Sequence, residues 1–162
     1  MIYGENSTAI RYDLRGGNDN PAHIALEIRP LVAFRDYHGT THENSSISRQ
    51  VNVEAGRASF TAYDGLPTLH FAHDADEVNV SGDWYRNFEY QAERERGLDF
   101  QEDLFNPFVL KFDMTGHSRA SIIASTDIRD AGRIQDYQQA GITRRADIIR
   151  SEERRVGKEC RL

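Results

Sequence analysis

The feature that most constrains the fold is an alternation of apolar and polar residues that recurs in many short segments. In one of them, Ile24, Leu26 and Ile28 alternate with small or charged neighbours. The same pattern recurs at 51–53, 58–62, 69–71, 78–80, 84–90, 108–114 and 120–124, and the short segment 7–15 is rich in β-prone residues. Side chains two residues apart lie on one face of a strand, so each segment predicts a strand with one buried face. Short strands at spacings of about 8–12 residues predict a mainly β, antiparallel β-sandwich.

Turn-forming residues separate these segments. The run 16–21 (GGNDNP) follows the first segment, and Pro30 ends the second or restricts it to a sheet edge. The polar stretch 39–48 is expected to be a loop. Further turns are expected at Gly56, Asp64-Gly65 and Gly82-Asp83.

The period changes after about residue 126, where Thr126 or Asp127 is expected to be the N-cap of a helix. Five apolar residues fall within about 140° on a helical projection: Ile134, Tyr137, Ile142, Ile148 and Ile149. Gly141 lies inside this helix and weakens it by about 1 kcal/mol relative to Ala. The predicted organisation is a sandwich domain over 1–126 and an amphipathic linker helix over 127–149.

The last residues, 150–162, do not resemble the rest of the chain. Their first eleven residues, RSEERRVGKEC, match the in-frame translation of a common DNA sequencing adapter, and we expect the segment to be non-native. A charged, disordered tail is the alternative. Without this tail the formal charge of the chain changes from −6 to −8. The one cysteine, Cys160, also falls in the tail, so neither a disulfide nor a cysteine-based site is expected.

Composition excludes several classes of function. No run of about 18 apolar residues and no signal-like segment is present, so neither a membrane partner nor a secreted precursor is expected. The acidic balance disfavours a nucleic-acid partner and fits a cytoplasmic protein. P-loop and G-x-G-x-x-G motifs are missing, and no cofactor is expected. His38 and His42 have a zinc-like spacing, but they lie in a loop, so no metal site is predicted.

The first candidate site is the run Phe34-Arg35-Asp36-Tyr37-His38 at a strand end. Guanidinium and carboxylate groups match pairs of sugar hydroxyls, and an aromatic ring can stack on the C–H face of a sugar. The alternative is that Arg35 and Asp36 only tie a strand end to a loop.

The second candidate is an aromatic and charged stretch over 84–103, which resembles the lining of a saccharide groove. Its candidate residues are Trp84, Tyr85, Glu89, Asp99, Glu102 and Asp103. Glycosidases place two carboxyl groups on either side of the scissile bond, and this stretch is rich in carboxylates. The alternative is a core stripe of aromatic residues, Trp84 and Phe88 included, with a solvated, charged opposite face.

A series of short motifs follows in order along the chain: GENST (4–8), RY (11–12), LEIRPL (26–31), FRDYH (34–38), THEN (41–44), YDGLP (63–67), WYRNFEY (84–90), ERERGLD (93–99) and EDLF (102–105). This series resembles the N-terminal domain of bacterial and archaeal glycogen debranching enzymes of the amylo-α-1,6-glucosidase type. Together the motifs extend the resemblance over about residues 1–149.

The resemblance implies a β-sandwich followed by an (α/α) barrel that carries the catalytic acids. It also implies strands before the GENST motif, so we expect a sandwich incomplete at its N-terminus and a chain that lacks the barrel. No catalytic residue is therefore assigned, and the candidate residues are expected to contact substrate or the neighbouring domain. The parent enzyme would hydrolyse α-1,6-linked branch stubs in glycogen. A stand-alone carbohydrate-binding sandwich and an interdomain-docking domain are the alternatives.

Overall fold

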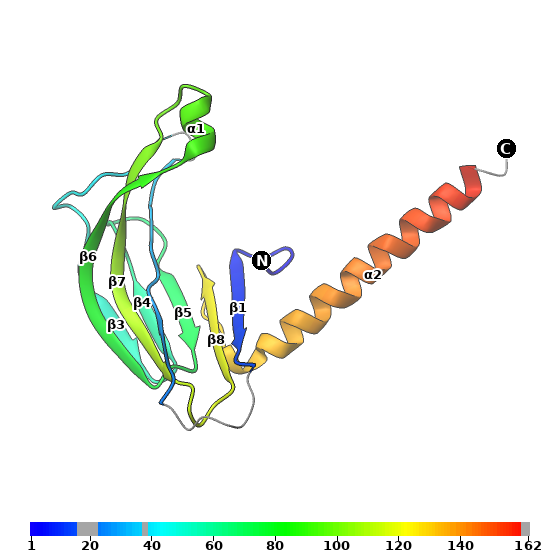
Figure 1. Ribbon diagram of the computed structural model, residues 1–162, viewed down its shortest axis with the longest axis horizontal. Coiled ribbons are helices and arrows are strands. Elements are labelled where there is room, and N and C mark those ends of the chain that lie inside the picture. Colours follow the sequence, from blue (N-terminus) through cyan, green and yellow to red (C-terminus); the bar gives the residue numbers. More distant parts are fainter. Residues whose placement is uncertain (16–22, 37–38, 160–162) are drawn as a thin grey trace.

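Two antiparallel sheets pack face to face and confirm the predicted sandwich (Figure 1). The computed structural model describes residues 1–15, 23–36 and 39–159. One sheet contains, in spatial order, β1 (Ser7–Asp13), β8 (Arg119–Ser125), β5 (Leu69–His73), β4 (Arg57–Phe60) and β3 (Val51–Glu54). The other sheet contains β2 (Ala25–Ile28), β7 (Gln101–Asp113) and β6 (Glu77–Glu89).

Aromatic residues on the inward faces of the strands form the centre of the sandwich. The ring of Phe71 meets that of Phe108 edge to face, with centroids 5.1 Å apart. Phe105 lies between Phe60 and Trp84, at centroid distances of 5.5 and 5.3 Å. Each such ring, when fully buried, contributes on the order of 2 kcal/mol to stability. The apolar residues that alternate in the sequence are therefore the ones whose side chains form this core.

Strand β6 departs from the predicted organisation. Gly82-Asp83 was expected to separate two strands, and this prediction is wrong, since β6 continues past both residues along β7. The register shifts between Val80 and Asp83, where Gly82 has a φ of +74°. Such a bulge needs one residue with left-handed backbone, and glycine adopts it without a Cβ clash. Gly82-Asp83 therefore forms a bulge rather than a turn, because β6 pairs with β7 on both sides of these residues.

A second bulge explains another wrong expectation about β6. Strict alternation predicts Trp84 and Arg86 on the same face, yet Trp84 is buried and Arg86 is exposed. The register shifts between Tyr85 and Phe88, and Asn87 has a φ of +62°. Beyond this bulge, the unpredicted short helix α1 (Gln91–Glu95) leads into β7.

The C-terminal helix begins later than predicted and continues further. Thr126 and Asp127 are not its N-cap. Instead Asp130 caps a 3-10 turn, η1 (Ala131–Arg133), by accepting the Gly132 N–H at 2.8 Å. Helix α2 (Ile134–Glu159) follows directly and runs past residue 149, consistent with the helix-forming Glu, Arg and Lys residues there.

Only the first turns of α2 pack on the sandwich, and the rest projects away from it (Figure 1). Ile134 is buried against Ala72 and Ile123 on the outer face of the five-stranded sheet. The later stripe residues Ile142, Ile148 and Ile149 are exposed. No helix in the described ranges is both long and apolar enough to cross a membrane.

The five-stranded sheet extends beyond the three-stranded sheet at β1. Ile10 and Tyr12 pair with the core residues Ile122 and Ala120 of β8, so their side chains share the inward face of the sheet. Both remain about two-fifths exposed, at 43% and 42%. This side of the sandwich is therefore left partly uncovered by β2.

Candidate functional site

Three of the ten predicted site residues take part in one hydrogen-bonded group at the end of the sandwich near α1. Arg35 lies on the segment after β2, and Glu102 and Asp103 lie at the beginning of β7. Tyr37 and His38 fall outside the described residues. We call the interacting group the α1-end cluster, which comprises Arg35, Thr41, Glu43, Arg86, Asn87, Tyr90, Glu102 and Asp103.

Glu102 is the centre of this cluster, and its side chain is only 1% exposed. Arg35 donates to both carboxylate oxygens, through Nε to Oε1 and through Nη2 to Oε2 at 3.2 Å. The backbone N–H of Thr41 also donates to Oε1 at 3.1 Å, and the hydroxyl of Tyr90 donates to Oε2 at 2.6 Å. Each oxygen of Glu102 therefore already accepts two hydrogen bonds.

This arrangement fixes the ionised form of Glu102. Burial alone would raise the pKa of Glu102, but the hydrogen bonds from Arg35 and Tyr90 outweigh burial and lower that pKa. The hydrogen bond from Arg35 to Glu102 raises the pKa of the Arg35 guanidinium. The separate hydrogen bond from Tyr90 to Glu102, together with burial, raises the pKa of Tyr90. Over the neutral range Glu102 therefore stays ionised, while Arg35 and Tyr90 keep their protons.

Asp103 fastens two further segments to β7. Its carboxylate accepts the backbone N–H of Glu43 and that of Asn87, each at 2.9 Å. These two hydrogen bonds lower the pKa of Asp103. The bond to Asn87 also supports the left-handed backbone of the bulge. From that bulge Arg86 reaches the exposed Glu43 and forms an ion pair with it.

Trp84, Tyr85, Glu89 and Asp99 lie outside this cluster, and Asp36 borders it next to Arg35. Trp84 belongs to the aromatic core, as the alternative interpretation expected, and its buried Nε1 has no hydrogen-bond partner within the described ranges. Tyr85 is exposed on the outer side of β6, and Glu89 accepts from Gln101 Nε2 at 3.1 Å. Asp99 is exposed in the turn after α1. The backbone carbonyl of Asp36 accepts from Arg35 Nη1 at 3.2 Å.

Chemically, the α1-end cluster is built to hold segments together. The general acid of a glycosidase needs a raised pKa, so that it carries a proton at neutral pH. In the cluster the pKa values of Glu43, Glu102 and Asp103 are all lowered. Both oxygens of Glu102 are also already in use. The cluster therefore fastens Arg35, Thr41, Glu43 and the β6 bulge to β7.

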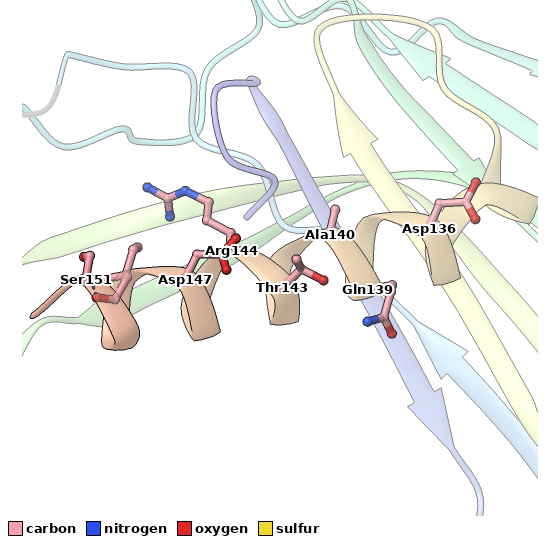
Figure 2. A pocket seen from close by; sticks show the side chains of 8 residues that line it. Asp136, Gln139, Ala140, Thr143, Arg144, Asp147 and Ser151 are labelled. Carbon is pink, nitrogen blue, oxygen red and sulfur yellow. Dashed lines mark hydrogen bonds between the residues drawn. The ribbon is translucent and has the colours of Figure 1, made fainter. Parts of the chain in front are cut away.

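Two hollows involve α2, and sequence reasoning anticipated neither. One lies along the helix, and Figure 2 shows its lining side chains in a row on one side of α2, from Asp136 to Ser151. All eight lining residues belong to this single helix, so the hollow is a helix surface rather than a built site.

The other hollow, which we call the N-terminal groove, lies between residues 1–6 and α2. The guanidinium of Arg144 lies 3.3 Å from the ring centroid of Tyr3, and that of Arg133 lies 5.8 Å from the centroid of Tyr137. The contact between Tyr3 and Arg144 joins the N-terminal residues to α2, and no local pattern in the sequence reveals it. The available signal was the GENST motif, whose first residues line the groove.

These features define an antiparallel β-sandwich domain with a helical extension and a structural ion-pair cluster at one end. The family model described as "Glycogen debranching enzyme N terminal" matches residues 1–120. The chain belongs to this family, and the match confirms the resemblance found in its motifs. Comparisons with curated proteins and with solved structures found no match.

Proposed function

We propose that this chain is a non-catalytic part of a glycogen debranching glycoside hydrolase that cleaves α-1,6-glucosidic branch stubs. Family membership supports the substrate class, because the matched model is the N-terminal part of glycogen debranching enzymes. In this proposal the catalytic acids belong to an (α/α) barrel that follows the sandwich in the parent protein. The neutral glucan substrate and the acidic composition suit a cytoplasmic enzyme without nucleic-acid or membrane partners.

The observation that carries the non-catalytic role is the state of the carboxylates in the α1-end cluster. Cleavage of a glycosidic bond needs one protonated carboxyl group and a second that acts as base or nucleophile. Glu102 is sealed by Arg35 and Tyr90, and Asp103 is held by two backbone donors. These acids stabilise the fold, so the proposal assigns the chemistry to another part of the enzyme.

The test compares the 162-residue chain with the complete gene product that contains it. Each protein is incubated with a limit dextrin whose branches end in single α-1,6-linked glucose residues, and free glucose is measured. We expect glucose from the complete protein and none from the chain alone. Glucose released by the chain would overturn the non-catalytic role, and no release by the folded complete protein would overturn the debranching activity.

Glu102→Gln and Glu89→Gln in the complete protein form a matched pair for the same assay. Glu102 is buried and hydrogen-bonded, whereas Glu89 is exposed on the same end of the molecule. Under the proposal the Glu102 variant loses thermal stability but keeps kcat measured below its melting temperature, and the Glu89 variant keeps both. Loss of kcat in a folded Glu102 variant would contradict a purely structural carboxylate.

A stand-alone carbohydrate-binding role is the second candidate, and the open N-terminal groove is the observation that favours it. Under this alternative the chain alone is retarded in a gel containing glycogen, and no further domain is needed. This alternative would be favoured if the isolated chain bound glycogen as strongly as the complete protein and the complete protein showed no debranching activity.

A further inference from the structure

Strand β1 lies at one edge of the five-stranded sheet, next to β8 (Figure 1). Its seven residues keep one continuous register with β8. The other edge strands within the described ranges are protected, because β2 and β3 have four residues each and β6 carries two bulges. Short strands and bulges keep a sheet edge from pairing with another chain. β1 has neither protection and no proline, so its edge is open to a further strand.

Two hydrogen bonds just beyond β1 show which of its backbone groups face β8. The N–H of Thr126 donates to the carbonyl of Asn6 at 3.4 Å, and the N–H of Leu14 donates to the carbonyl of Ser118 at 2.8 Å. Backbone groups of successive residues point to opposite sides of a strand. The even-numbered residues in the range 6–14 therefore bond to β8, and the odd-numbered ones point to the other side, which we call the free edge of β1.

The free edge is occupied only at its beginning. There the N–H of Ile2 donates to the carbonyl of Ser7 at 2.8 Å, so the turn over the first residues covers Ser7. Beyond it the N–H and carbonyl groups of Ala9, Arg11 and Asp13 face the free edge, and no strand of the described residues pairs with them. These unused donors and acceptors are in position for main-chain hydrogen bonds to another strand.

The side chains of β1 add apolar contacts and opposite charges to this edge. Ile10, Tyr12 and Leu14 alternate on the inward side, and each is about two-fifths exposed, at 43%, 42% and 40%. On the outer side, Arg11 Nε donates to a carboxylate oxygen of Asp13 at 3.0 Å, and both side chains are partly exposed. An apolar stripe and one charge of each sign thus lie within five consecutive residues.

This pattern is self-complementary in one antiparallel register. When Tyr12 lies opposite Tyr12 of a second copy, Arg11 of each copy lies opposite Asp13 of the other, and Ile10 lies opposite Leu14. Arg11 and Asp13 both face the free edge, so each such pair exchanges two main-chain hydrogen bonds. The two neighbouring registers place Arg11 opposite Arg11 or Asp13 opposite Asp13, and like charges directly opposite are destabilising.

We propose that the free edge of β1 pairs with β1 of a second copy of this chain, in the register centred on Tyr12. The two five-stranded sheets then form one continuous sheet across a two-fold axis, and the same surface serves both copies. The complementary charges of Arg11 and Asp13 favour a second copy over an uncharged apolar segment as the occupant. This inference goes beyond the proposed function and does not depend on the glucan substrate.

The test is sedimentation velocity on the 162-residue chain over a series of protein concentrations, in which we expect a reversible dimer. Arg11→Glu places two carboxylates opposite each other, and Asp13→Arg places two guanidinium groups opposite each other. Each variant alone should have a dissociation constant raised at least about tenfold. An equimolar mixture of the two should dimerise within about twofold of the parent chain, because each pair then joins opposite charges.

Arg11→Pro tests the main-chain bonds. It removes an N–H that faces the free edge and takes no hydrogen bond from β8, so it should also weaken the dimer at least about tenfold. Arg29→Glu is the matched control, because Arg29 forms a similar exposed ion pair with Glu27 next to edge strand β2. It should leave the dissociation constant unchanged within about twofold. Thermal melts by circular dichroism establish that each variant is folded.

Four outcomes overturn the inference. They are a chain that stays monomeric at every concentration, a dimer that Arg11→Glu and Arg11→Pro leave unchanged, a variant mixture that stays monomeric, and a dimer that Arg29→Glu abolishes. The complete gene product is measured in the same way. If it is monomeric while the 162-residue chain dimerises, another segment of the parent covers β1, and the proposal is wrong for the complete protein.

Discussion

The α1-end cluster and the free edge of β1 differ in how much of their hydrogen-bonding capacity is used. In the cluster, Glu102 accepts from Arg35, Tyr90 and the backbone of Thr41, and no acceptor position is left for a ligand. At the free edge, the backbone groups of β1 that point away from β8 meet no further strand among the described residues. Polar groups therefore indicate a binding surface only where their hydrogen-bonding capacity remains unused.

The largest expected effect is on the cluster. Glu102→Ala leaves the partly buried guanidinium of Arg35 without its counter-ion and removes the acceptor of Tyr90. Removing one partner of a buried pair typically costs about 3 kcal/mol, and we expect a loss of about that size in the free energy of unfolding by urea. Glu89→Ala, at an exposed pair, is the control and is expected to change stability by less than about 0.5 kcal/mol. Similar losses of unfolding free energy in the Glu102 and Glu89 variants would contradict the special structural role of Glu102.

Acid should weaken the α1-end cluster. The pKa values of Glu102 and Asp103 are lowered from ordinary values of 4.5 and 3.8. Their stabilisation is therefore present above those ordinary values and is lost as pH falls through the lowered folded-state values. Urea unfolding measured between pH 6 and pH 2 should show this loss, and Glu102→Gln should reduce it. An unchanged acid profile in that variant would assign the titration to other groups.

A second pH window belongs to His73 in the core. The Nδ1 atom of His73 accepts the Ala75 N–H at 3.2 Å. Its Nε2 is buried and has no partner among the residues that the structure describes. Burial lowers the pKa of His73 from its ordinary value of 6.5. Because the unfolded state binds the proton more readily, stability begins to fall as pH drops below about 6.5, and the loss is complete below the lowered folded-state pKa. His73→Gln should remove this upper phase while leaving the carboxylate phase in place. A persistent upper phase would point to another histidine.

A smaller, stabilising effect is expected on the groove side. Gly141→Ala removes a glycine from the middle of α2, where a Cβ meets open space. The variant should gain up to about 1 kcal/mol in helix stability, measured as increased protection of α2 amides from hydrogen exchange. Unchanged or reduced protection would show that α2 does not persist as a helix around residue 141.

The smallest effect is expected from Tyr3→Ala. The ring is largely exposed, so the free energy of unfolding should change by less than about 0.5 kcal/mol, in contrast with Glu102→Ala. A large loss of stability in the Tyr3 variant would mean that its contact with Arg144 fastens the chain in the way the cluster does.

The sequence predicted the sandwich because each strand carries its own pattern of alternation, as Phe108, Leu110 and Phe112 show. It did not predict the path of β6, since Gly82 is compatible with a turn or with a bulge, and the choice depends on pairing with the distant β7. The helix start was also misplaced, because Thr126, Asp127 and Asp130 all suit an N-cap and tertiary contacts at Ile134 decide among them.

The residue types in the sequence singled out the candidate residues, but the sequence did not show which of them form hydrogen bonds with one another. Arg35, Glu102 and Asp103 were candidates for contact with substrate or a neighbouring domain. The sequence cannot show that Arg35 and Glu102, separated by 67 positions, satisfy one another. The groove was missed because Tyr3 and Arg144 meet only in the folded chain. Pairing across such separations decides whether a polar residue binds a ligand or stabilises the fold.

The most direct test of this contrast is amide hydrogen exchange of the 162-residue chain, followed by NMR at low and at high protein concentration. The account predicts that protection of the Arg11 and Asp13 amides rises with concentration, while the amides of Thr41 and Glu43, which donate within the α1-end cluster, are protected equally at both. Protection of Arg11 and Asp13 that does not change with concentration, or a change centred on the α1-end cluster, would contradict it.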